Sequence, residues 1–257
     1  MSGVFLLRNF IFRTYNINCR YADGTHALRN FSFSLMSDEK LALVGANGSG
    51  KSTLLLHLMG CMEPVSGRIE YKGEAMGKEM YPKLRRETGM LFQNPEDQLI
   101  MTRVWDDVAF GPRNMGLTED EVRTRVTESL ERTGISHLAA REPWKLSGGE
   151  KSLVALAGIL AMNPSAILLD EHTSGLDPCS RRKLIGIIRE LDCSVLIATH
   201  DLDMVVDVCN RVLVLDRGTA AAESPVPGVL YDRDIMMSHS LELPLGYHGL
   251  LNENAVF

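Results

Sequence analysis

The chain has 257 residues, 45% of them apolar, so it can bury a sizeable core as one large domain or two small ones. Its formal net charge of −6, without a dense run of lysines and arginines, argues against a nucleic-acid-binding protein. The longest apolar run is too short to cross a bilayer, and the N-terminus lacks the features of a signal peptide. The five cysteines are scattered without a CxxC pair, so we expect a soluble protein with free thiols in a reducing cytosol.

The apolar runs predict a mostly parallel sheet. Near the N-terminus, FLLRNFIF and NINCRY are expected to be two strands, antiparallel and at an edge. Further along, short apolar runs flanked by Gly, Asp or Thr are separated by long helical patterns, which is typical of buried parallel strands with helices on both faces. These predicted strands are 41–44, 166–169, 195–198 and 212–215.

Between about residues 94 and 164 the pattern changes to helices. Thr118 with Glu121 forms a potential capping box, and Gly134 ends the helix that follows. Between them, apolar residues recur at four-residue spacing along one helix face: Val122, Val126 and Leu130. We therefore expect a helical insertion within an α/β core. The tail from about residue 232 has no clear periodicity.

A phosphate-binding loop is predicted at residues 45–52, GANGSGKS, which match G-x-x-x-x-G-K-[ST] between the strand KLALV and the helix STLLLHLMG. Glycines let successive N–H groups turn inward around a polyphosphate, and the helix N-terminus adds a favourable field. Lys51 is expected to reach the β- and γ-phosphates, and the Ser52 hydroxyl to bind Mg²⁺. The predicted loop residues are Gly45, Ala46, Asn47, Gly48, Ser49, Gly50, Lys51, Ser52 and Thr53.

Polar residues follow three of the later apolar strands. Asp170 ends AILLD and is expected to hold Mg²⁺ through its waters, while Glu171 beyond it could polarise a water for in-line attack. His200 ends SVLIATH and would point into the crevice where open α/β sheets bind ligands. Gln93 follows the apolar residues 90–92 and carries an amide that can bind both metal and water. Taken singly, each of these residues also has a purely structural interpretation.

A second glycine-containing loop, KLSGGEK, spans residues 145–151 and precedes the apolar run LVALAGILAM. Ser147 and Glu150 form a potential capping box, which leaves the backbone N–H groups of Gly148 and Gly149 free for an anion. The alternative is that SGGE merely begins a helix. One small chain thus carries two loops that could face phosphate.

The motifs GANGSGKST, FQNPEDQL, LSGGEK, LLDEHTSGLD and ATHD, in this order and spacing, closely resemble those of ABC transporter ATPase subunits, over about residues 5–220. The resemblance implies an α/β fold with a P-loop NTPase (RecA-like) core, an antiparallel edge β-subdomain and an inserted helical subdomain. It also implies an enzyme that couples ATP hydrolysis to transport, with ATP and Mg²⁺ as cofactors.

The same resemblance implies roles for further residues. Tyr21, in RYADG, matches the aromatic side chain that stacks on adenine, and Asp177, in SGLD, matches a loop that communicates across a dimer. The loop containing Ser147, Gly148 and Gly149 is expected to reach the γ-phosphate held by the opposite chain of a head-to-tail dimer. That dimer is either a homodimer or a heterodimer with a related ATPase.

Two positions depart from the family pattern. His172 stands where the family usually has proline, so the turn after Glu171 is expected to be less rigid. Leu153 stands where the family commonly has a basic residue. The second departure concerns helix contacts behind the KLSGGEK loop and leaves the loop itself intact.

The segment FQNPEDQLIMTRVWDDVAFGPRNMGL resembles energy-coupling-factor importers, and IATHDLDMVVDVCNRVLVLDRG with LELPLG is most similar to their cobalt/nickel branch. This implies a subunit peripheral to the cytoplasmic face of the cell membrane. It would bind an integral membrane coupling protein through the groove beside Gln93, while a separate membrane protein captures the substrate. We expect an ATPase domain over residues 1–231 and a tail over 232–257. The alternatives are a vitamin importer of the same type and a soluble ABC ATPase outside transport.

Overall fold

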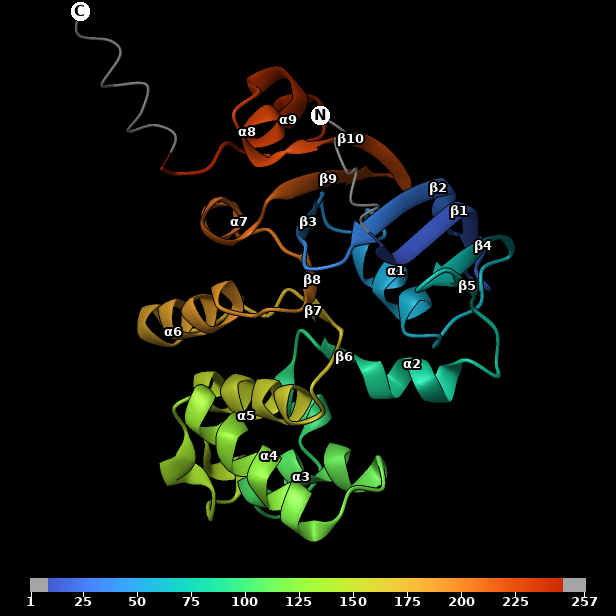
Figure 1. Cartoon of the computed structure of the whole chain (residues 1–257). Coiled ribbons are helices and arrows are strands. Elements are labelled where there is room, and N and C mark those ends of the chain that lie inside the picture. The colour runs from blue at the N-terminus through green and yellow to red at the C-terminus, as the bar shows by residue number, and fades with distance from the viewer. Residues whose placement is uncertain (1–8, 247–257) are drawn as a thin grey trace, which may run out of the picture.

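Six strands form the central sheet of the computed structural model, which describes residues 9–246 (Figure 1). Strands β9, β3, β8, β7 and β6 lie side by side and parallel, and β10 pairs antiparallel with β9. The predicted parallel strands are confirmed. Their bounds are β3 (Lys40–Val44), β6 (Thr88–Leu91), β7 (Ala166–Asp170), β8 (Ser194–Ala198), β9 (Arg211–Asp216) and β10 (Thr219–Pro225).

A second, antiparallel sheet of the described chain has the order β2-β1-β4-β5. Its strands are β1 (Phe10–Arg20), β2 (His26–Met36), β4 (Ser66–Tyr71) and β5 (Glu74–Ala75). The segments FLLRNFIF and NINCRY are strand and antiparallel as predicted, but within the described residues both belong to one strand, β1, and it lies between β2 and β4 rather than at an edge. Asn16, at φ 47°, lies where the β1–β2 register shifts between Thr14 and Ile17, so a bulge continues the strand through what looked like a break.

Short and medium helices connect these strands. None of the helices within residues 9–246 is long and apolar enough to cross a membrane. The helices outside the predicted insertion are α1 (Lys51–Leu58), α2 (Tyr81–Glu87), α6 (Pro178–Arg189), α7 (Leu202–Val208), α8 (Val226–Leu230) and α9 (Arg233–Ser238). The tail from residue 232 thus begins with a helix, α9, although its sequence shows no clear periodicity. Met236 of α9 is fully buried against the core, so tertiary packing rather than pattern stabilises this helix.

The predicted helical insertion gathers at one end of the molecule, below the central sheet in Figure 1. It contains α3 (Val104–Asn114), α4 (Glu119–Arg132) and α5 (Gly148–Ala161), with short 3-10 helices at Pro95–Gln98, Ser136–Leu138 and Pro143–Lys145. The Thr118–Glu121 capping box is present at the start of α4. Its predicted apolar face is buried, and Gly134, at φ 65°, follows the helix end. These local predictions are confirmed.

The central sheet separates two apolar cores. Along β3, Leu41 and Leu43 belong to the core shared with α1 and the antiparallel sheet, whereas Ala42 and Val44 belong to the core shared with α5, α6 and α7. This alternation is the period of a strand buried on both faces. The loop after β3 therefore begins at the centre of the molecule, between two packed layers.

The helical insertion meets the central domain where α5 and α6 begin. An ideal Cβ on Gly149 would lie 2.2 Å from Oγ and 2.5 Å from Cβ of Ser180, in the first turn of α6. A Cβ on the neighbouring Gly148 would have no heavy atom within 4 Å. The two glycines therefore differ: Gly149 allows a close helix contact, and Gly148 does not serve packing.

We expect Gly149→Ala to lower the free energy of unfolding by about 1–3 kcal/mol, because the added methyl group overpacks this contact. Ser180→Gly in the same chain should restore most of the loss, since it removes both clashing atoms. Gly148→Ala is the control and should be neutral or slightly stabilising. Thermal denaturation of the four proteins measures this. Equal effects of the two glycine substitutions would contradict the close contact.

Candidate functional site

The phosphate-loop candidate joins β3 to α1 in a conformation that requires glycine. Gly50, the N-cap of α1, has φ 112°, and a Cβ there would lie 2.4 Å from the carbonyl oxygen of Ala27. A Cβ on Gly45 would lie 2.1 Å from the carbonyl oxygen of Leu215. The loop is thus pressed against β2 and the end of β9, and larger residues at these two positions would displace it.

A cavity of 450 Å³ opens above this loop. The residues that line it are Tyr21, Thr25, His26, Ala27, Asn47, Gly48, Gly50, Lys51, Ser52, Thr53, Gln93, Glu171, Ser174 and His200. The fold therefore brings together the candidate aromatic, the loop, the amide, the carboxylate and the histidine from five separate segments. Ser147, Gly148, Gly149 and Asp177 are not among these lining residues.

Sequence reasoning missed four of the lining residues. Thr25 ends the turn between β1 and β2, where the amide of Tyr21 donates to the Thr25 carbonyl over 2.9 Å, and His26 and Ala27 begin β2. The turn sequence ADG just before Thr25 is the signal that could have placed them. Ser174 follows LLDEHT and carries no comparable signal.

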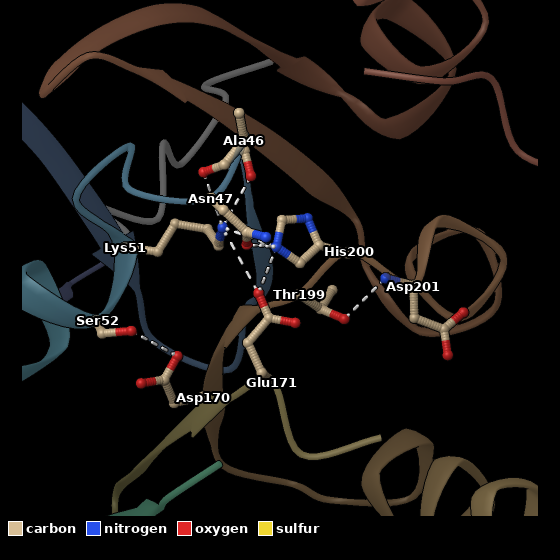
Figure 2. Close-up of polar contacts among 10 residues, drawn as sticks. Ala46, Asn47, Lys51, Ser52, Asp170, Glu171, Thr199, His200 and Asp201 are labelled. Atoms are coloured by element: carbon tan, nitrogen blue, oxygen red, sulfur yellow. Dashed lines mark hydrogen bonds and ion pairs between the residues drawn. The ribbon is translucent and has the colours of Figure 1, made fainter. Parts of the chain in front are cut away.

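Lys51 is the charged centre of the cavity floor. Its Nζ donates to the carbonyl oxygens of Gly45 and Ala46, over 2.8 Å and 3.3 Å, and lies 3.5 Å from Oε1 of Glu171 (Figure 2). Burial lowers the pKa of Lys51, while the nearby Glu171 and Asp170 oppose that shift. The ammonium group is therefore held by weak carbonyl acceptors and a carboxylate, which a phosphate could replace.

Glu171 turns back over the end of its strand because its backbone is left-handed. Its φ is 49°, and its amide donates to the carbonyl oxygen of Ala198 over 2.8 Å. A non-glycine residue in this region costs about 1–3 kcal/mol, which the surrounding contacts must offset. The conformation places the carboxylate between Lys51 and His200 (Figure 2).

His200 faces both the carboxylate and the loop. Its Nε2 lies 2.9 Å from Oε1 of Glu171, 2.8 Å from Oδ1 of Asn47 and 3.3 Å from Nζ of Lys51. Burial is the first cause that lowers the pKa of His200, the Lys51 charge is the second, and Glu171 opposes them. Because both oxygens accept hydrogen bonds, a neutral imidazole here carries its proton on Nε2.

The residues expected to hold Mg²⁺ offer suitable oxygen ligands. Oγ of Ser52 donates to Oδ1 of Asp170 over 3.1 Å, and Gln93 lines the same cavity. Burial raises the pKa of Asp170, although the Ser52 hydrogen bond and Lys51 lower it. A hydroxyl, a carboxylate and an amide oxygen are ligands that Mg²⁺ accepts, and a bound cation would also relieve the cost of burying the carboxylate. These residues therefore fit the ion.

Tyr21 lies at the mouth of the cavity, with 41% of its surface exposed. Its hydroxyl group lies 2.8 Å from Oγ1 of Thr53, so one end of the ring is tied to α1. The exposed ring is an apolar surface against which a flat base could stack.

The KLSGGEK loop starts α5 with the predicted capping box. The backbone amide of Ser147 donates to the Glu150 carboxylate over 2.8 Å, and the amide of Glu150 donates to Oγ of Ser147 over 3.3 Å. Asp177 caps α6, accepting from the amides of Cys179 and Ser180. Both features lie outside the 450 Å³ cavity of their own chain.

A second hollow of 320 Å³ lies beside the segment that follows Gln93, and Glu96, Leu99, Ile100, Met101, Thr102, Pro143, Trp144 and Lys151 line it. Ile100 and Trp144 are 64% and 61% exposed, which is unusual for such large apolar side chains. Lys151, in the first turns of α5, forms an ion pair with Glu96 on the rim. The hollow is thus connected to the KLSGGEK loop by a charged contact.

The structure explains in part why His172 stands where the family usually has proline. A residue that precedes proline is driven towards extended backbone, so the left-handed Glu171 is compatible with His172 rather than with proline. His172 is only 3% exposed, and neither nitrogen of its imidazole has a partner among the described residues. Burial lowers its pKa to about 4, although Asp201 raises it.

His172→Leu should stabilise the protein and weaken its sensitivity to acid. The unfolded chain binds a proton at an ordinary histidine pKa, whereas folded His172 does so only near pH 4, so wild-type stability falls as pH drops from about 6.5 to 4. The loss is on the order of 3 kcal/mol. Urea denaturation at pH 7 and pH 4.5 measures it. His137→Leu, which replaces an exposed histidine, is the control, and equal pH dependence of both variants would refute the prediction.

Comparisons with known proteins agree with this geometry. A family model described as ABC transporter matches residues 28–174. The chain is 44% identical to the energy-coupling factor transporter ATP-binding protein EcfA of Methanothermobacter thermautotrophicus, over 89% of this chain and 75% of that one. It is 50% identical to a putative ABC transporter ATP-binding protein of Gloeobacter violaceus, over 88% and 93% of the two chains.

Solved structures give the same family. CbiO1 of Clostridium perfringens, part of the ABC transporter complex CbiONQ, superimposes with a TM-score of 0.81 at 37% identity, covering 95% of this chain and 99% of that one. A dimeric ATP-binding cassette with ADP and phosphate bound superimposes with a TM-score of 0.77 at 26% identity, covering 84% and 98%. This chain belongs to the ABC transporter family, as an ATP-hydrolysing subunit of the energy-coupling-factor type.

Proposed function

We propose that the chain powers the uptake of a transition-metal cation, cobalt or nickel, as the ATPase of an energy-coupling-factor importer. The observation that supports ATP hydrolysis most directly is the convergence of Lys51, Glu171 and His200, whose polar atoms lie within 3.5 Å of one another in the cavity. The cation class rests on the resemblance of IATHDLDMVVDVCNRVLVLDRG and LELPLG to the cobalt/nickel branch. A vitamin importer of the same type is the second candidate.

In the proposed reaction, the γ-phosphate of ATP takes the place of Glu171 beside Lys51. The freed carboxylate accepts a proton from a water whose oxygen attacks the γ-phosphorus, while the bond to the β-phosphate oxygen breaks. His200, neutral with its proton on Nε2, donates to the γ-phosphate and orients it. Mg²⁺ neutralises charge on the phosphates when bound, and Ser52, Asp170 and Gln93 are the residues that would hold it.

The KLSGGEK loop is proposed to complete the site of a second chain. Ser147, Gly148 and Gly149 lie outside their own cavity, yet the capping box leaves the Gly148 and Gly149 amides at a helix N-terminus, where an anion is favoured. A head-to-tail dimer would place each loop on the ATP of the other chain. Each chain of such a dimer, whether of identical or related subunits, would contribute to both sites.

The 320 Å³ hollow is proposed as the docking site for the integral membrane coupling protein. Exposed Ile100 and Trp144 supply apolar anchors, and the ion pair of Glu96 with Lys151 supplies polar groups on the rim that a partner side chain could share. Gln98, in the segment beside the hollow, points inward instead, since its amide donates to the Met90 carbonyl and its oxygen accepts from the Phe92 amide. It would therefore hold the segment that lines the hollow in place rather than contact the partner.

Glu171→Gln should bind ATP with near-normal affinity but hydrolyse it roughly a hundredfold more slowly, because the amide cannot accept the proton from water. Trapped ATP should then hold two chains together. Nucleotide binding measures the affinity, phosphate release measures the rate of hydrolysis, and light scattering measures whether two chains are held together.

The matched control is Glu171→Gln combined with Ser147→Arg. It should keep nucleotide binding, because Ser147 is outside the cavity of its own chain, but should stay monomeric. A Glu171→Gln protein with normal turnover would refute the role of the carboxylate. An ATP-bound monomer, alone and with the membrane proteins, would refute the shared site.

Ile100→Lys should abolish uptake of radiolabelled cobalt and nickel in cells that carry the membrane components, because it buries a charge in the proposed contact. ATP binding by the purified chain should be unchanged. Val65→Lys is the control, since Val65 is 69% exposed, lies directly before β4 and does not line the hollow. Normal uptake in Ile100→Lys would show that the docking site lies elsewhere. Uptake of a vitamin instead of either metal by the wild-type transporter would refute the proposed substrate, a metal cation.

A further inference from the structure

Two loops and the start of a helix in the central domain meet at one carboxylate, that of Asp201. It directly follows His200 and accepts two hydrogen bonds of 2.6 Å from Nε and Nη2 of Arg181, in the first turn of α6. It also accepts from the amide of Met204 over 3.1 Å, capping α7, and from the hydroxyl of Thr173. The carboxylate therefore joins the loop that carries Glu171, the start of α6 and the loop that carries His200.

This contact is stronger than a surface ion pair. The Asp201 side chain is 18% exposed, and the guanidinium binds both of its oxygens, a geometry that fixes orientation as well as charge. Burial alone would raise the pKa of Asp201, but the hydrogen bonds from Arg181 and the Met204 amide outweigh it, so the pKa lies below its ordinary value. The backbone amide of Asp201 also donates to Oγ1 of Thr199 over 2.9 Å (Figure 2).

The other side of α6 faces the KLSGGEK loop. Asp177 caps α6 and accepts from the amide of Ser180, whose hydroxyl occupies the space beside Gly149. Arg181 is the next residue, and its amide donates to the Asp177 carbonyl over 2.9 Å. A continuous set of contacts thus runs from Gly149 through the first turn of α6 and Asp201 to His200.

We propose that Arg181 and Asp201 are a positioning pair that holds His200 against Glu171, and that through this pair the KLSGGEK loop influences the placement of His200. The inference rests on the proposed function, in which that loop binds the ATP of the opposite chain. The pair would then connect the two ATP sites of the dimer through a single helix turn. Neither residue lines the cavity, so neither acts on substrate directly.

Loss of the guanidinium would leave Asp201 without its charged partner and free the segment that begins at His200. The 2.9 Å contact between His200 and Glu171 would then loosen, whereas the loop around Lys51, which binds nucleotide, would keep its own contacts. The expected signature is therefore a loss of kcat without a matching loss of nucleotide affinity.

The first measurement is steady-state hydrolysis and nucleotide affinity of Arg181→Met, Arg181→Lys and Asp201→Asn. We expect kcat to fall roughly tenfold or more in Arg181→Met, with affinity changed by less than about threefold. Lysine, which keeps the charge but not the paired hydrogen bonds, should restore part of kcat. Asp201→Asn retains the helix cap, and combined with Arg181→Met it should cost no more than either change alone.

Arg113→Met is the matched control, because Arg113 also binds a carboxylate, that of Glu119, through two nitrogens, with Asp106 as a further partner, but lies on α3 in the helical insertion. It should leave kcat unchanged. If Arg181→Met does not fold, Arg181→Lys and Asp201→Asn carry the test. Normal kcat in the folded variants, with only a lower melting temperature, would reduce the pair to a structural role and overturn the proposal.

A second measurement needs no hydrolysis. In the nucleotide-free chain, the pKa of His200 is followed by the NMR signal of its Hε1 proton, identified by its loss in His200→Ala. Release of the ring into solvent should raise this pKa in Arg181→Met and leave it unchanged in Arg113→Met. An unchanged titration in folded Arg181→Met overturns the proposal even if the wild-type chain hydrolyses no ATP, an outcome that would separately refute the proposed function.

The link to the KLSGGEK loop is tested in the same titration. Gly149→Ala pushes against Ser180 and should shift the His200 signal, whereas Gly148→Ala should not. In an Arg181→Met background the effect of Gly149→Ala should disappear, because the connection is already broken. Equal shifts with and without Arg181 would show that the influence does not pass through the pair and would overturn that part of the proposal.

Discussion

The buried ammonium group of Lys51 is the charge around which the site is organised. Carbonyl oxygens of its own loop and the carboxylate of Glu171 surround it. Such a group cannot remain buried without acceptors, because desolvation of an unpaired charge is costly. The same requirement makes the site receptive to a polyphosphate, whose oxygens are better acceptors than peptide carbonyls. The resting arrangement thus pairs Glu171 with Lys51, and the proposed reaction begins when an anion takes its place.

The central sheet makes this arrangement possible by its parallel order. Because β3, β7 and β8 run in the same direction, their carboxyl ends deliver the loop of Lys51, the pair Asp170–Glu171 and His200 to one edge. Burial of β3 on both faces holds that edge between two packed cores. Small displacements at the edge are therefore resisted by the interior, and catalytic distances near 3 Å can be maintained.

The helical insertion serves a different purpose from the central domain. It carries the KLSGGEK loop and the exposed hollow, and it touches the central domain through the contact between Gly149 and Ser180. The ion pair between Lys151 and Glu96 joins the hollow to the same helix that begins with the loop. A partner docked in the hollow and a nucleotide bound at the loop would therefore act on one rigid element, α5. In the proposed function, this shared element would couple partner binding to nucleotide state.

The sequence by itself determined the features that depend on local spacing. The loop at 45–52, the capping boxes at Thr118 and Ser147, and the buried parallel strands follow from hydrogen bonds within a few residues or from apolar runs, and the sheet confirms the strands. Resemblance to a family added Tyr21 and Asp177, whose roles spacing alone does not give.

The tertiary structure decided what depends on residues far apart in the chain. β1 continues through a bulge at Asn16 because β2 and β4 pair with it on both sides. Asp201 became a junction because Arg181, 20 residues earlier, reaches it from another helix. No local pattern encodes such contacts, since they exist only after the sheet has brought the loops together.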